Sequence, residues 1–254
     1  MSVFVERPNL PHNAEKILIG AKYSDILAKV LKNIGFSPIF VPDNPHVDNR
    51  LSGHCDLSVL HGGGDTLFLA PFLKNSLLSA QLSELGAKII FPAISQGEKY
   101  PNDAQMNMAA VGKNLIYCEG VSSEDIVRYF TNSGGLTPCT GRQGYSRCSI
   151  CIVDDNSIIT ADSTIAQAAK KSGLSVLQIS PGNIDLKGFE YGFIGGAAFK
   201  LSDDKIAFTG SLDGHPDKHK IIDFLGQRDI RPVFLTDMPI FDIGGAVPIT
   251  EKRL

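Results

Sequence analysis

The sequence lacks the features that would assign it to a membrane, a secretory route or a nucleic acid. Its 254 residues contain no apolar run that approaches the length of about 18 residues that a membrane-spanning helix needs. The segment Met1–Glu6 carries no basic stretch followed by an apolar one, so we expect no secretory signal. The net charge is −3, with no block of like charges and no lysine- and arginine-rich patch. We therefore expect neither membrane insertion nor nucleic-acid binding.

Cysteine and nucleotide-binding motifs are also scarce. The five cysteines are odd in number, which together with the missing signal favours reduced thiols and a cytoplasmic protein. Neither G-x-x-x-x-G-K-[ST] nor G-x-G-x-x-G opens a helix. Gly62–Asp65 resembles the G-G-D-G-T loop of the NAD kinase family, but its aspartate follows three glycines, which favours a hairpin turn. We expect no cofactor.

Two spacings typical of metal ligands have simpler interpretations. Cys148 and Cys151 are three positions apart, and on a predicted strand such residues point to opposite faces, so we expect core cysteines. His215 and His219 lie where an outer helix is predicted to begin, a place that an aspartate cap explains as well. No third ligand accompanies either pair at the spacing of a zinc site, and we expect no metal.

What the sequence does contain is a unit that recurs five times. Hydrophobic residues make up 43% and charged ones 20%, as in soluble globular proteins, and the length predicts a single domain over residues 1–254. A glycine recurs about every 48 residues, each time near the end of a helix-like stretch, and repeats of this size indicate one supersecondary unit used several times. The helices are predicted at Ser24–Ile34, Lys74–Leu85, Ser122–Asn132, Ser163–Ser172 and Pro216–Leu225.

Each predicted helix is followed by a short apolar strand and then by a strand pair joined through a polar turn. The single strands are predicted at Pro38–Val41, Lys88–Phe91, Leu136–Cys139, Ser175–Ile179 and Pro232–Leu235. The last unit lacks one strand, which Lys16–Ile19 can supply, so we expect the array to close head to tail and remove its sheet edges. The glycine pairs Gly195-Gly196 and Gly244-Gly245 lie at predicted strand ends and favour close backbone approach.

Five ββαβ units closed by the terminal strands resemble the pentein fold of guanidine-modifying enzymes, such as arginine deiminase, agmatine deiminase and dimethylarginine dimethylaminohydrolase. The resemblance implies an α/β fold, a five-bladed α/β propeller with a pseudo-fivefold axis and helices outside. The chain also looks like an uncharacterised bacterial family of that fold. In the enzymes a cysteine attacks the guanidinium carbon, a histidine acts as general acid and base, and carboxylates hold the cation.

Both catalytic positions of that family differ in this chain. The family's nucleophile lies in a pattern G-G-x-x-C-x-S/T, and the matching stretch Gly244–Thr250 has Pro248 in place of the cysteine. Proline offers no nucleophile. The family's histidine corresponds to the stretch Gly144–Arg147, which contains none. The resemblance therefore implies a pentein without the usual cysteine and histidine.

The positions that the resemblance implies for ligand binding do carry carboxylates in this chain. The resemblance places family carboxylates at Asp56 and near Asp103, and we expect Asn102, Gln143, Tyr145 and Arg147 to lie close by. Our leading hypothesis is a binder of a small cationic or zwitterionic ligand of guanidino or amino-acid type, without the cysteine–histidine hydrolysis.

Two other hypotheses stay open. The first is a deiminase or amidinohydrolase with a relocated nucleophile, for which Cys55 beside His54 is the candidate pair. The second is a macromolecular interaction protein, because the same scaffold serves as a ribosome anti-association factor, translation initiation factor six. A homodimer is compatible with each hypothesis, and fold alone does not choose among them.

Overall fold

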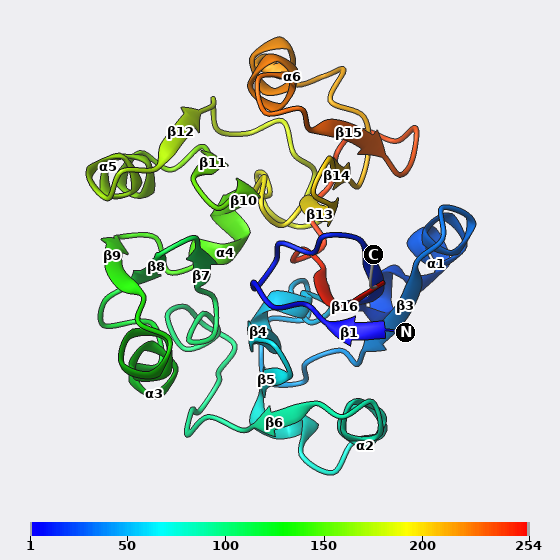
Figure 1. Ribbon diagram of the computed structural model, residues 1–254, viewed down its shortest axis with the longest axis vertical. Helices are drawn as coiled ribbons and strands as arrows, with labels where there is room; N and C mark the ends of the chain where they lie inside the picture. The colour runs from blue at the N-terminus through cyan, green and yellow to red at the C-terminus, as the bar shows by residue number, and fades with distance from the viewer. Residues whose placement is uncertain (1, 253–254) are drawn as a thin grey trace.

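The computed structural model describes residues 2–252 and contains five small mixed sheets, with five of the six α-helices at the periphery (Figure 1). Four sheets share one order: an antiparallel hairpin, a helix, and a strand parallel to the second hairpin strand. Their strands are β4 (Val59–Gly63), β5 (Thr66–Leu69) and β6 (Lys88–Ile90); β7 (Ala109–Val111), β8 (Asn114–Cys118) and β9 (Thr137–Gly141); β10 (Ile150–Asp154), β11 (Ser157–Thr160) and β12 (Ser175–Gln178); β13 (Ala198–Ser202), β14 (Lys205–Phe208) and β15 (Arg231–Phe234).

The fifth sheet joins the two ends of the chain and confirms the predicted head-to-tail pairing. Its strands are β1 (Ser2–Phe4), β16 (Val247–Lys252), β2 (Ala14–Gly20) and β3 (Ser37–Val41), in that order. β16 runs antiparallel to β2, and Pro248 lies opposite Ile17. The register shifts between Pro248 and Thr250, as expected where a proline cannot donate to the ladder.

The helices begin and end close to their predicted bounds, with three differences. They are α1 (Ser24–Asn33), α2 (Leu77–Glu84), α3 (Glu124–Arg128), α4 (Ser146–Ser149), α5 (Ser163–Lys171) and α6 (Lys218–Gly226). The start of the predicted second helix is wrong, because Pro71–Leu73 forms a separate 3-10 turn and Ser76 caps α2 through its hydroxyl. The third predicted helix changes into a wider π turn at Tyr129–Ser133. The single turn α4 was not predicted at all.

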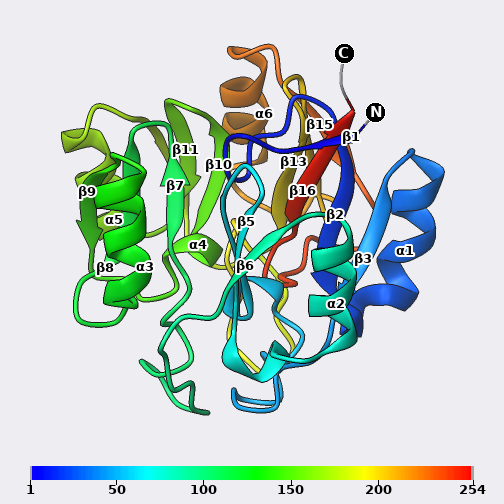
Figure 2. The ribbon, with the colours of Figure 1, turned by 60° about the horizontal axis from the view of Figure 1, so that its bottom comes forward.

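The segment between β1 and β2 crosses one end of the ring, over the hairpin turns of several sheets (Figure 1, Figure 2). The Glu6 carbonyl oxygen accepts a hydrogen bond from Gly64 in the β4–β5 turn, and the His12 carbonyl oxygen accepts one from Asp203 in the β13–β14 turn. Arg7 forms an ion pair with Asp155 in the β10–β11 turn. Among residues 2–252 no helix is both long and apolar enough to cross a bilayer.

Candidate active site

A buried group of ionisable side chains lies where loops of different sheets meet, and we call it the Cys148 cluster: His54, Asp56, Cys148 and Asp242. Cys148 belongs to α4, Asp56 to the 3-10 turn η2 (Cys55–Leu57) that His54 precedes, and Asp242 to the segment before β16. The possible ligand atoms of His54, Asp56 and Cys148 all lie within 4.8 Å of one another. The Cys148 thiol donates to Asp56 Oδ2 at 2.7 Å, and His54 Nδ1 is 3.9 Å from Asp242 Oδ1.

Backbone and amide hydrogen bonds hold Cys148 in this place. α4 is closed by a bond from the Ser149 amide to the Tyr145 carbonyl oxygen. Asn107, fully buried, accepts from the Cys148 amide at 3.1 Å and donates to its sulfur at 3.5 Å. The Gly196 amide donates to the Cys148 carbonyl oxygen. Cys148 is therefore fixed from two other parts of the chain.

Glycines let the chain approach the cluster at van der Waals distance. A Cβ on Gly196 would lie 1.9 Å from Asp242 Oδ1, and a Cβ on Gly244 would lie 2.4 Å from the Cβ of His54. Gly244 also has a φ of +69°, in the left-handed region that other residues adopt at a cost. The predicted close approach at these two glycine pairs is confirmed.

Asp242 is held as an oriented carboxylate. Its Oδ1 accepts from the Gly244 amide and its Oδ2 from the Phe193 amide, each at 2.8 Å. An ionised carboxylate can accept about four hydrogen bonds, so each oxygen keeps capacity for a ligand.

Burial controls the protonation of the thiol and its partner. Burial, followed by the negative charge of Asp56, raises the pKa of the Cys148 thiol well above its ordinary value. Burial is also the main cause that raises the pKa of Asp56. Both groups are thus biased towards their neutral forms, because a low dielectric disfavours charge. A cation next to them would bias them the other way.

Two polar atoms of the cluster have no hydrogen-bond partner within the described chain. They are His54 Nε2 and Asp56 Oδ1, and both are buried. Leaving such an atom unpaired costs roughly 1–3 kcal/mol, so this arrangement is expected where a bound molecule supplies the missing contact.

A pocket of about 130 Å³ opens beside the cluster. Three polar side chains of the cluster, His54, Cys148 and Asp242, form one part of its lining. The rest is apolar or aromatic: Leu51, Tyr145, Leu186, Phe189, Tyr191 and Phe193. A cysteine, a histidine and a carboxylate next to aromatic walls can bind a small cation and carry out thiol chemistry on it.

The sequence over residues 18–247 matches a family described as "Family of unknown function (DUF6873)". The chain belongs to this family. No curated protein matches the chain in sequence.

Comparison with solved structures shows which fold this chain has. The inosamine-phosphate amidinotransferase of Streptomyces griseus is 11% identical, with 98% of this chain and 97% of that chain covered and a TM-score of 0.59. The agmatine deiminase of C. jejuni with substrate bound is 9% identical, with 100% and 98% covered and a TM-score of 0.57. DDAH from Pseudomonas aeruginosa, complexed with citrulline, is 11% identical, with 88% and 93% covered and a TM-score of 0.52. Such similarity shows the pentein fold.

The structure brings a thiol and an imidazole together at residues that the sequence analysis did not pair, Cys148 and His54. The predicted strand across Cys148 is a helical turn, which brings the Cys148 sulfur to His54 and Asp56. Cys151 lies in β10 within the core, so only its interpretation as a core cysteine holds.

Cys55 lies in a different environment from the one expected of a relocated nucleophile. Its sulfur donates to the Leu18 carbonyl oxygen at 3.8 Å, within an apolar cluster, and Cys55 is not part of the pocket lining. Burial raises the pKa of its thiol. The structure thus places His54 beside Cys148, whereas Cys55, the neighbour of His54 in sequence, lies in the core.

The predicted ligand-binding residues lie in different places relative to the pocket. Asp56 lies behind Cys148 and outside the pocket lining, whereas Tyr145 lines the pocket. Asp103 accepts from the Tyr145 hydroxyl at 2.6 Å, and Gln143 Oε1 accepts from the Tyr145 amide at 3.1 Å. These two residues therefore position Tyr145, while the side chain of Asn102 is exposed to solvent.

Arg147 is buried next to the cluster but does not line the pocket. Its guanidinium donates to the carbonyl oxygens of Ile150 and Gly195 and to Asn9 Oδ1. These bonds to neutral acceptors make Arg147 a fixed internal positive charge near Asp56, not a clamp for a ligand carboxylate.

Sequence reasoning missed Cys148, Asn107 and Asp242. Asp242 stands two positions before the Gly244-Gly245 pair, a signal that could have directed attention to it. Asn107 has no local signal, because its role comes from contacts 41 positions away.

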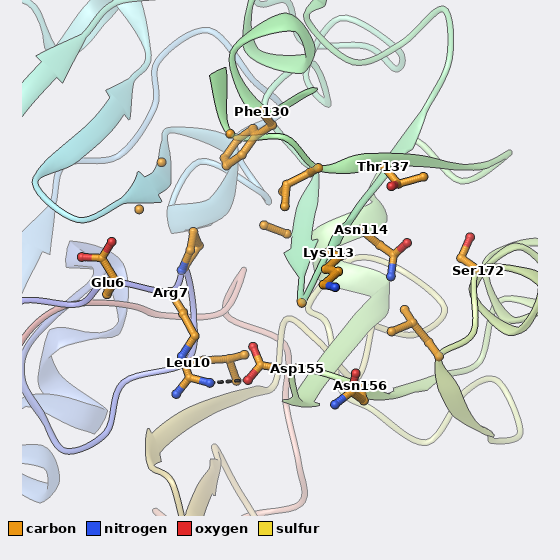
Figure 3. A pocket seen from close by; sticks show the side chains of 18 of the residues that line it. Glu6, Arg7, Leu10, Lys113, Asn114, Phe130, Thr137, Asp155, Asn156 and Ser172 are labelled. Atoms are coloured by element: carbon orange, nitrogen blue, oxygen red, sulfur yellow. Dashed lines mark hydrogen bonds and ion pairs between the residues drawn. The ribbon is translucent and has the colours of Figure 1, made fainter. Parts of the chain in front are cut away.

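A larger hollow of about 1370 Å³ lies at the hairpin-turn end, and Figure 3 shows the side chains around it. Its lining includes the Arg7–Asp155 ion pair, Lys113 and the Gly62–Asp65 turn, but no member of the Cys148 cluster. The predicted hairpin turn at Gly62–Asp65 is confirmed. The hollow and the pocket beside Cys148 are therefore separate features.

Proposed function

We propose that this protein binds a small guanidinium- or amidinium-type cation in the pocket beside the Cys148 cluster and cleaves a C–N bond of it through the Cys148 thiol. One observation carries the proposal: the buried Cys148 thiol, His54 imidazole and Asp56 carboxyl group lie within 4.8 Å of one another, and the thiol and the imidazole line a small pocket. The matched structures bear the names of amidinotransferases and deiminases, which supports chemistry on an amidino group.

Binding would rest on Asp242 and the aromatic walls. The planar cation would donate to Asp242, whose two oxygens are already oriented by backbone amides, and its faces would lie against Tyr145, Phe189 or Phe193. The positive charge would also lower the energy of an ionised Cys148, because opposite charges at close range favour the charged form.

The reaction would use the existing hydrogen bond from Cys148 to Asp56. Binding of the cation favours the ionised form of Asp56, which releases its proton to solvent. The thiol proton then passes to this carboxylate, and sulfur forms a bond to the central carbon of the cation. His54 donates a proton to the departing nitrogen as the C–N bond breaks. Water then adds to the carbon, and one of its protons passes to His54. As the S–C bond breaks, Asp56 returns its proton to sulfur and the remaining hydroxyl proton passes to the released ammonia or amine. The products of a guanidinium are a urea and an ammonium ion, and those of an amidinium are an amide and an ammonium ion.

Binding without turnover is the second candidate. It is favoured by the raised pKa of Cys148, which keeps the thiol protonated in the empty pocket, and by Pro248 at the position of the family's usual nucleophile. In that case the cation would be held by Asp242 and released unchanged.

We also infer that the five sheets form the blades of one propeller around a pseudo-fivefold axis. The repeated strand order and the closure of the last sheet by both chain ends support this interpretation. In such an arrangement the Cys148 cluster would lie near the axis.

Calorimetry with methylguanidine and propylguanidine, combined with an assay for released ammonium or amine, tests the proposal. We expect wild-type protein to bind and convert at least one compound, and Asp242→Asn to lose at least tenfold in affinity. Asp103→Asn is the control, because Asp103 lies outside the pocket lining and accepts from the Tyr145 hydroxyl, and we expect a smaller loss. No binding by the wild type, or equal binding by Asp242→Asn, would reject the proposal; binding without product would select the second candidate.

A further inference from the structure

The lining of the pocket has one carboxylate, Asp242, and no lysine or arginine among its nine residues. Its one basic side chain is His54, which the proposed reaction uses as proton donor to the departing nitrogen. A ligand with a carboxylate of its own would therefore have no guanidinium or ammonium partner inside the pocket, at a cost of several kcal/mol if it were desolvated.

An arginine that contacts the pocket lining from outside has its hydrogen-bond donors already engaged. Arg50 lies over the ring of Phe189, 4.2 Å from its centroid. Its Nε and Nη2 donate to the two oxygens of Asp48, and its Nη1 donates to the Gly188 carbonyl oxygen. Every nitrogen of the guanidinium therefore has a hydrogen-bond partner, and the guanidinium packs against the ring of Phe189.

The loop that carries the aromatic wall contains one further cation, Lys187. Its side chain is exposed, it does not line the pocket, and Glu190 of the same loop carries the opposite charge. Among the described residues, neither Arg50 nor Lys187 is therefore positioned to bind a carboxylate in the pocket.

From this lining we infer that the substrate class is a guanidinium or amidinium cation with a short apolar substituent and no carboxylate, in contrast to an amino acid such as arginine. The inference rests on the proposed function. The volume of about 130 Å³ is below the roughly 300 Å³ where drug-sized ligand pockets begin, so it suits a cationic head and a tail of a few carbons. Leu51, Leu186 and Tyr191 would bury that tail.

Two compounds of matched length test the inference: propylguanidine and 3-guanidinopropionate, which differ in a terminal carboxylate. We expect the wild type to bind propylguanidine at least tenfold more tightly in calorimetry. Lys187→Gln should leave both affinities within about twofold, because Lys187 is not part of the lining.

A variant that adds a positive charge to the pocket lining provides a second test beside the comparison of the two compounds. Tyr191 is partly exposed, with 38% of its surface accessible, so Tyr191→Arg should fold and place a cation at the lining. We expect it to narrow or reverse the preference against the carboxylate, whereas Tyr191→Gln, the uncharged control, should not.

The outcomes separate the two proposals. If neither compound binds the wild type, the proposed function fails. If both bind equally, or the carboxylate binds more tightly, the proposed function stands and the inference on the substrate class is overturned. The same holds if Lys187→Gln selectively weakens the carboxylate, since this would reveal a clamp.

Discussion

The sulfur of Cys148 lies 2.7 Å from Oδ2 of Asp56, although the two residues are 92 positions apart in sequence. Both are buried, and neither is in an environment that favours its charge. Burial thus favours the protonated forms of both groups, and they lie beside a pocket that the Asp242 carboxylate lines. In the proposed function, a cation bound by Asp242 would also favour ionisation of the Cys148 thiol.

Removing the buried carboxylate should change how stability depends on pH. The pKa of Asp56 is raised from 3.8 on folding, so the folded state keeps its proton while the unfolded state releases it as pH rises. Asp56 therefore destabilises the protein increasingly above about pH 4. We expect the free energy of unfolding of Asp56→Asn to gain on the wild type between pH 4 and pH 8 in urea titrations.

Asp213 provides a control of opposite sign. Its hydrogen bond from Lys218 lowers its pKa, so its contribution appears as pH rises and is lost as pH falls. Asp213→Asn should therefore be less stable than the wild type by a constant amount between pH 4 and pH 8, and this deficit should shrink only below about pH 4. A constant difference for Asp56→Asn across this range would contradict the account of the buried pair.

Gly196 should not tolerate a side chain. Alanine there would place Cβ 1.9 Å from Asp242 Oδ1, and two backbone amides hold that carboxylate. We expect Gly196→Ala to lower the free energy of unfolding by about 1–3 kcal/mol and to weaken ligand binding. Gly226→Ala, at a helix end with open space, should raise it by up to about 1 kcal/mol. Equal effects of the two variants in thermal unfolding would show that close approach at Gly196 is unimportant.

The buried guanidinium of Arg147 should be irreplaceable by lysine. Its nitrogens serve three acceptors in different segments, and a lysine amine lacks the planar fork needed to reach them. We expect Arg147→Lys to cost about 3 kcal/mol in urea unfolding. Arg142→Lys, at an exposed position, should stay within about 0.5 kcal/mol of the wild type. If Arg147→Lys is as stable as Arg142→Lys, the donors of Arg147 contribute little.

A chelator should leave the protein unchanged. His54, Asp56 and Cys148 are of the types that bind zinc, but in the proposed function they carry out proton transfer and thiol attack. Dialysis against EDTA should alter neither the melting temperature nor cation binding. One zinc ion per chain in elemental analysis, with destabilisation after chelation, would identify a metal centre instead.

Much of the architecture follows from local sequence signals. Glycines after amphipathic stretches mark the ends of α1 and α5, and the missing strand of the last unit predicts its pairing with β2. The Gly244-Gly245 pair likewise predicts close approach, because few residues other than glycine adopt such backbone angles without strain.

The site itself is less visible in the sequence, for a physical reason. Whether Cys148 points into a pocket depends on α4, a single turn held by Asn107 and Gly196 from distant segments. Local propensity gives no indication of such contacts, so the residues around Cys148 read as a strand. The ligand-binding role predicted for Asp56 stays a prediction, and its hydrogen bond with Cys148 could come only from the three-dimensional structure.

Mass spectrometry after rapid acid quenching tests the central claim most directly. Wild-type protein incubated with propylguanidine should carry an amidino adduct on the peptide containing Cys148, and Cys148→Ser should form neither adduct nor product while still binding the cation. Cys55→Ala, which alters a core thiol, should retain the adduct. An adduct on Cys55, or undiminished product formation by Cys148→Ser, would contradict the account.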